Sequence, residues 1–97
     1  MSVTVMFEFH VQGDKVSELK GVLKAILPDT RAYDGCQSVT VHQDQDEPTT
    51  LVVYETWASR PQYEKYLAWR TETGAVASLG EALAEAPSLR FFDTVDA

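Results

Sequence analysis

The sequence predicts an α+β fold built on one antiparallel sheet. Apolar and polar residues alternate in four segments, 3–11, 36–43, 49–57 and 89–95, and this period of two is typical of β-strands. Elsewhere, apolar residues recur every three or four positions, which is typical of amphipathic helices. The resulting order, strand, helix, strand, strand, helix, strand, predicts a ferredoxin-like βαββαβ arrangement, with its second helical region divided.

The first strand and helix are predicted from residues 3–28. Apolar side chains occupy the odd positions of 3–11 and mostly polar ones the even positions, which separates the two faces of the strand. Gly13 and Asp14 form a turn, and Asp14 can cap the helix that follows. Pro28 is expected to kink or end that helix. The helix itself is indicated by its spaced apolar residues, Val16, Leu19, Leu23 and Ile26.

The middle of the chain predicts a hairpin. The turn Asp34-Gly35 precedes the strand 36–43, and the acidic run 44–48 forms a loop before the strand 49–57. This last strand has β-branched or aromatic residues on both faces, so both faces of the sheet require a cover. Helices cover one face, and a second copy of the sheet would cover the other. We therefore expect a homodimer.

The second helical region begins at a clear capping signal. Ser59 and Gln62 have the spacing of a capping box, and Pro61 suits a first helical turn. The pattern predicts a helix over 60–70, a break at Gly74, and a short helix that Pro87 ends. The short helix is indicated by Val76, Leu79 and Leu83.

Length and composition limit the classes of function. Ninety-seven residues form one domain, 1–97, and the net charge of −7 disfavours nucleic acid and anionic membrane surfaces. The same charge favours a neutral or phenolic ligand over an anionic one. Cys36 is the sole cysteine, so an internal disulfide is excluded and a reducing cytoplasm is expected. The first residues form a strand pattern rather than a leader, and no segment has transmembrane length.

Several short motifs between residues 30 and 67 follow one another in a defined order. They are Thr30-Arg31, Gly35-Cys36, Asp46-x-Pro48-Thr49, Glu55-Thr56-Trp57-x-Ser59, and Tyr63 with Leu67. Together they resemble the antibiotic biosynthesis monooxygenase domain, a family of dimeric α+β barrels. The resemblance implies a ferredoxin-like protomer, a dimer with its sheets face to face, and a pocket between sheet and helices. Members include cofactor-free oxygenases of polycyclic phenols or quinols, haem-degrading enzymes and an isomerase, so fold alone does not select the activity.

The resemblance also implies site residues. In the cofactor-free oxygenases it places a tryptophan beside the pocket at the position of Trp57 and a tyrosine at that of Tyr63. An asparagine that accompanies them corresponds to Val53 here, and many members have a histidine in place of Tyr66. The alternative for Trp57 is a purely structural anchor at the end of a strand.

Other candidate residues follow from their positions. On the second helix, Tyr63, Tyr66 and Arg70 share one face, where a phenol can donate to a substrate carbonyl and a guanidinium can favour a deprotonated oxygen. Trp69 beside them is a further substrate-contacting candidate, and the alternative is simple packing of the aromatic residues on the sheet.

The first strand offers three more candidates on its even-numbered face. If that face lines the pocket, His10 is a candidate general base, and Met6 and Glu8 contact the substrate beside it. If it faces solvent or a dimer partner, these are ordinary surface residues.

Bound cofactors are not expected. The haem-degrading members share an asparagine, a tryptophan and a haem-ligating histidine whose positions correspond to Met6, Tyr66 and Val76. No set of ligands has the spacing of a metal site, and no glycine-rich nucleotide motif is present. Cys36 is expected to be a buried, small apolar group.

Two hypotheses remain. The first is a cofactor-independent monooxygenase that oxidises a small hydrophobic aromatic substrate, such as a phenol, quinol or anthrone, with molecular oxygen. The second is a non-catalytic dimeric α+β barrel that binds a small hydrophobic molecule or serves as an accessory subunit, and the missing asparagine and histidine favour it.

Overall fold

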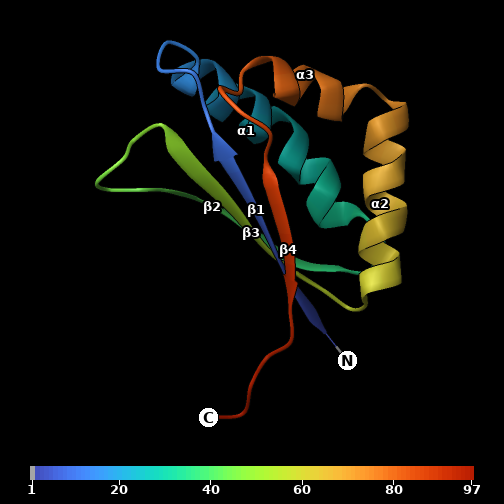
Figure 1. Cartoon of the computed structure of the whole chain (residues 1–97). Helices are drawn as coiled ribbons and strands as arrows, with labels where there is room; N and C mark the ends of the chain where they lie inside the picture. The colour runs from blue at the N-terminus through green and yellow to red at the C-terminus, as the bar shows by residue number, and fades with distance from the viewer. Residues whose placement is uncertain (1) are drawn as a thin grey trace.

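The strands form a single antiparallel sheet in the order β2-β3-β1-β4. The computed structural model describes residues 2–97. Figure 1 shows the helices together on one side of the sheet. In chain order the elements are β1 (Val3–His10), α1 (Val16–Ala32), β2 (Cys36–Gln43), β3 (Thr50–Trp57), α2 (Arg60–Glu72), α3 (Ala75–Glu81) and β4 (Ser88–Phe92). The ferredoxin-like βαββαβ prediction is confirmed, including its divided second helical region.

The register of β1 against β3 sets which side chains face the helices. Val5 pairs with Glu55 and Phe9 with Leu51, and all four are buried on the helix side. On the opposite face Met6 pairs with Tyr54, whose side chain is 41% exposed. The sheet therefore has one face packed under the helices and one open face in the single chain.

Helix α1 differs from its prediction at both ends. Its N-cap is Lys15 rather than Asp14, and no side chain caps it. It continues through Pro28 to Ala32, although a proline inside a helix costs about 3 kcal/mol. The last turns are held by tertiary contacts, because Leu27 and Thr30 are buried and Arg70 donates to the Ile26 carbonyl at 2.7 Å. Packing thus overrides the local signal of Pro28.

The start of α2 confirms the capping signal. Ser59 Oγ accepts a hydrogen bond from the Gln62 backbone N–H at 3.3 Å and donates to Gln62 Oε1 at 2.9 Å. Gly35 lies against the same glutamine with φ +94°, where a β-carbon would come within 2.8 Å of Gln62 Cδ. A glycine is therefore required where the chain enters β2 beside α2.

Strands β1 and β4 both end earlier than predicted. Strand β4 stops at Phe92 instead of continuing to Val95, because Phe92 already pairs with Thr4 near the beginning of β1. At the other end Val11 lies outside β1 and forms an isolated bridge with Leu83. No helix within residues 2–97 is both long and apolar enough to span a membrane.

Candidate functional site

A cavity of about 50 Å³ lies between the sheet and the helices. Its wall is largely apolar, and side chains from β1, β3 and all three helices contribute to it. The lining residues are Phe7, Phe9, Leu23, Ile26, Leu27, Val53, Glu55, Tyr63, Tyr66, Leu67, Arg70, Ala75, Val76 and Leu79. Polar groups from two elements therefore reach this otherwise apolar space: Glu55 from β3, and Tyr63, Tyr66 and Arg70 from α2.

The predicted aromatic residues come together at one end of this cavity. Trp57 is fully buried, and its ring lies 5.4 Å from that of Tyr63 and 5.0 Å from that of Tyr66, centroid to centroid. Tyr63 and Tyr66 line the cavity, whereas Trp57 stands behind them. The position of Trp57 suits a residue that fixes the orientation of its neighbours.

Glu55 is the site residue that sequence reasoning missed. It is 3% exposed, and its Oε1 accepts a hydrogen bond from Trp57 Nε1 at 3.1 Å. Burial raises the pKa of Glu55 to about 7, and the hydrogen bond from Trp57 opposes that rise. A signal was present, because this carboxylate alternates with Leu51, Val53 and Trp57 on a buried strand face where a charge is costly.

Arg70 is held by an extensive hydrogen-bond network. Its Nε donates to the Tyr66 hydroxyl at 2.9 Å, and its Nη2 donates to Thr30 Oγ1 at 3.0 Å. The Tyr66 and Thr30 hydroxyls are themselves 2.6 Å apart. Arg70 as a whole is 7% exposed, and no carboxylate within residues 2–97 forms an ion pair with it. A buried cation in a cavity wall attracts an anion or a developing negative charge.

Tyr63 differs from Tyr66 in its bonding. No hydrogen bond of its hydroxyl is found among residues 2–97, and because no fully enclosed side-chain oxygen there lacks a partner, this hydroxyl is not fully enclosed although Tyr63 is only 1% exposed. Burial and then the charge of Glu55 raise the pKa of Tyr63 far above its usual range. The phenol therefore stays protonated and can donate a hydrogen bond to a bound molecule.

Of the two remaining helix-side candidates, Val53 lies in the cavity wall and Trp69 lies outside it. Val53 is 4% exposed and lines the cavity. Trp69 is half-buried outside the lining, where it stacks on Tyr33 at 5.4 Å between ring centroids and lies 4.6 Å from Arg70 Cζ. Trp69 therefore contacts Arg70 rather than the cavity.

Of the two alternatives for the even-numbered face of β1, the single chain shows the second, because that face does not line this cavity. Met6, Glu8 and His10 lie on the open face, because Phe7 and Phe9 between them point toward the helices. His10 Nε2 and Glu8 Oε2 are 3.0 Å apart, and His10 Nδ1 lies 3.3 Å from Thr50 Oγ1. The sheet itself separates His10 from the cavity, so it is not positioned as a base there.

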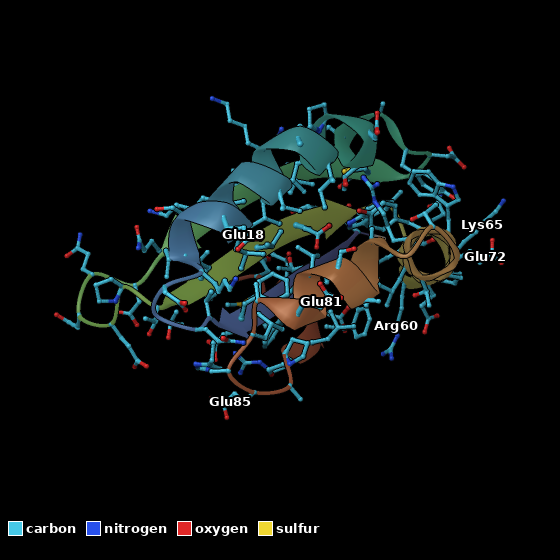
Figure 2. The ribbon with its side chains drawn as sticks, turned by 90° about the horizontal axis from the view of Figure 1, so that it is seen from above. Glu18, Arg60, Lys65, Glu72, Glu81 and Glu85 are labelled. Atoms are coloured by element: carbon cyan, nitrogen blue, oxygen red, sulfur yellow. The ribbon has the colours of Figure 1, made fainter. Side chains whose placement is uncertain are left out.

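Cys36 lies near both the aromatic cluster and Glu55. Its side chain is half-buried, and burial followed by the charge of Glu55 raises the pKa of its thiol. On the outer side of α2, Lys65 and Glu72 are exposed and point away from the protein (Figure 2). Within residues 2–97, His, Cys, Asp and Glu side chains form no group of three suited to a metal ion.

Comparison with known proteins shows which family this chain belongs to. Residues 2–71 match the sequence profile of the family described as antibiotic biosynthesis monooxygenase. The chain belongs to this family. A proposed monooxygenase of Mycobacterium tuberculosis, Rv0793, is 32% identical over 78 residues, which cover 74% of this chain and 76% of that protein. Membership of the antibiotic biosynthesis monooxygenase family supports a monooxygenase activity.

Solved structures of the family share the fold. The structure of Rv0793 superposes with a TM-score of 0.87 at 27% identity, covering 100% of this chain and 98% of that one. SnoaB, a cofactor-independent oxygenase from Streptomyces nogalater, is similar with a TM-score of 0.85 at 17% identity, covering 99% and 95% of the two chains. At that identity the likeness to SnoaB shows that the two chains share a fold.

Proposed function

We propose that this chain is a cofactor-independent monooxygenase that oxidises an electron-rich phenol, hydroquinone or anthrone-like compound with molecular oxygen. The observation that carries the proposal is the largely apolar cavity with the guanidinium of Arg70 in its wall, which forms no ion pair with any carboxylate of residues 2–97. Such a lining suits the faces of a flat apolar ring, and the guanidinium favours its anion. Family membership and the name of SnoaB add support, without identifying the substrate.

The reaction balances without an added reductant. A base removes a proton from the substrate, and the resulting carbanion or enolate transfers electrons to dioxygen, forming a carbon–oxygen bond. The peroxide is protonated, the O–O bond breaks, and water leaves with the second hydrogen of the carbon. A CH₂ group thus becomes C=O, with one oxygen atom in the product and the other in water.

The residues of α2 and β3 have separate roles in this proposal. Arg70 stabilises the substrate anion, and the Tyr63 hydroxyl donates a hydrogen bond to it. Tyr66 is fixed by Thr30 and Arg70, so its ring forms a rigid wall. Trp57 holds the positions of Tyr63 and Tyr66 from behind, and Val53 provides an apolar surface for the substrate ring.

The size of the cavity requires movement before a polycyclic substrate binds. A cavity of about 50 Å³ holds dioxygen or about four waters, whereas ligand sites usually measure about 300–1,000 Å³. Ala75, Val76 and Leu79 of α3 form part of the wall, and α3 has no fully buried residue. Displacement of α3 is therefore the proposed route for enlarging the site.

A homodimer is part of the proposal. On the open face of the sheet the side chains of Tyr54 and Phe92 are 41% and 39% exposed. Met6 and Val52 on the same face are half-buried. A second copy would cover these side chains, together with the His10 and Glu8 pair. Sedimentation equilibrium tests it: we expect a dimer for the wild type and a monomer for Tyr54→Asp. A monomeric wild type would contradict this part of the proposal.

Oxygen consumption with anthrone tests the activity. We expect one dioxygen consumed per anthrone, and one labelled oxygen atom in the anthraquinone when ¹⁸O₂ is supplied. Tyr63→Phe should lower the turnover, while Tyr54→Phe, the same change on the open face, should not. Absence of oxygen uptake across a panel of anthrones, hydroquinones and phenols would overturn the proposal.

A binding protein without turnover is the second candidate. It is favoured by Val53, which lines the cavity where the resemblance expects an asparagine. Binding of anthrone, followed by quenching of tryptophan fluorescence, without oxygen uptake would support this candidate instead.

A further inference from the structure

Glu55 has one carboxylate oxygen available to the cavity. Its Oε1 is bonded to Trp57 Nε1, and no hydrogen bond to Oε2 is found among residues 2–97. That part of the chain contains no fully enclosed side-chain oxygen or nitrogen without a partner. Because Glu55 is 3% exposed and lines the cavity, Oε2 is accessible from inside the cavity.

The groups around Glu55 leave it as the available base. Tyr63 on α2 and Cys36 on β2 both have a raised pKa, so both remain protonated near neutral pH. Tyr66 and Arg70 on α2 also face the cavity, and Tyr66 is occupied by its bonds to Thr30 and Arg70. The α1 side chains in the wall are Leu23, Ile26 and Leu27, and none of them ionises.

We propose that Glu55 is the proton acceptor of the oxygenation, and that its Oε2 takes the proton from the substrate's acidic C–H or O–H group. This inference rests on the proposed function. The electron pair of the broken bond stays on the substrate, and the proton becomes bonded to Oε2. The same proton then returns to the peroxide formed with dioxygen, so Glu55 is regenerated before water leaves.

The protonation equilibrium of Glu55 suits this role. Burial raises its pKa to about 7, so ionised and protonated forms coexist near neutrality. The Trp57 N–H favours the ionised form and fixes the carboxylate in place. Trp57 is therefore a positioning residue for Glu55, which gives it a second task besides supporting the tyrosines.

Proton abstraction can be measured without oxygen. Anthrone is incubated with the protein in anaerobic D₂O buffer, and exchange of its methylene hydrogens is followed by NMR. We expect the wild type to accelerate exchange and Glu55→Gln to lower that acceleration by roughly 100-fold or more. Glu64→Gln, the same change on the exposed side of α2, should exchange as fast as the wild type. Thermal unfolding of each variant checks its folding.

Oxygen uptake measured in parallel separates the two proposals. Exchange that depends on Glu55 without oxygen uptake would support Glu55 as the base and overturn the oxygenase function. Oxygen uptake and exchange that Glu55→Gln reduces by less than about threefold would overturn the role of Glu55 alone. Absence of both in the wild type would overturn both proposals.

A second variant covers a failure of Glu55→Gln to fold. Glu55→Asp keeps the carboxylate and withdraws it from the substrate by one methylene group. We expect reduced exchange that still rises with pH through a single ionisation. Wild-type rates in Glu55→Asp, or rates without pH dependence, would contradict proton transfer to this carboxylate.

Discussion

The carboxylate of Glu55 accepts a hydrogen bond from the indole of Trp57 at 3.1 Å, although both side chains are almost fully buried. The two residues are neighbours on one face of β3, separated by a single position. This bond is one polar contact among aromatic rings, and it connects Trp57, a residue that the family resemblance matches, to the ionisable group in the cavity wall.

The first prediction concerns the pH dependence of stability. The pKa of Glu55 rises from 4.5 in the unfolded chain to about 7 in the folded one. The unfolded state therefore loses its proton first as pH rises, and the free energy of unfolding falls between about pH 4.5 and 7. The loss attributable to Glu55 is at most about 3 kcal/mol and is complete above about pH 7.

Urea unfolding at several pH values measures this effect. Glu55→Gln should remove the decrease and make the protein more stable than the wild type at about pH 8. Glu64→Gln, on the exposed face of α2, serves as the control and should retain the wild-type slope. A decrease that persists in Glu55→Gln would show that another group causes it.

The second prediction concerns Arg70. Replacement by methionine loses three hydrogen bonds but also removes the cost of burying a guanidinium that has no carboxylate partner within residues 2–97. These effects are similar in size, so we expect stability to change by less than about 1 kcal/mol. The KM for an ionisable phenol should rise roughly tenfold or more, because the cation no longer favours its anion. Arg60→Met, at an exposed position, is the control for steady-state kinetics.

The third prediction concerns the size of the cavity. Leu79→Ala shortens a half-buried side chain in the wall formed by α3. We expect a higher kcat/KM for tricyclic than for monocyclic substrates, with a loss of about 1–2 kcal/mol in stability. Ser78→Ala, exposed on the same helix, should change neither quantity. An equal effect on large and small substrates would argue against enlargement at α3.

The fourth prediction uses one substitution at two glycines. Gly35→Ala places a β-carbon 2.8 Å from Gln62 at a positive φ, so we expect a loss of about 2 kcal/mol in the free energy of unfolding. Gly21→Ala, inside α1 with open space around it, should instead stabilise the protein by up to about 1 kcal/mol. Chemical denaturation compares them, and changes of the same sign would contradict the argument.

Local patterns predicted most of the fold. The alternation of residues gave the strands and their faces, and Ser59 with Gln62 gave the start of α2. Patterns failed where distant residues decide the outcome. Pro28 indicates a helix end, but Arg70, far along the chain, supports the turns that follow it. Phe92 ends β4 because its partner strand ends, which no local signal near Phe92 reveals.

The candidate site was predictable in part. The aromatic residues Tyr63 and Tyr66 were predicted from helical spacing, and Trp57 from the family motif, and the structure brings them together. His10 was considered because histidine titrates near neutrality, but its even position on β1 directs it away from the cavity. Residue type does not indicate Glu55 as a base, because glutamate ordinarily titrates well below neutrality. Its burial under the helices, which no local pattern reveals, is what changes that behaviour.

The small cavity beside α3 has a kinetic consequence. In the proposed mechanism dioxygen fits the resting space, whereas a polycyclic ring enters only after α3 is displaced. The rate of capture of the organic substrate should then level off at the opening rate of α3, whatever the oxygen concentration. The slowest step of the catalytic cycle would then be the opening of α3 rather than electron transfer from the substrate to dioxygen.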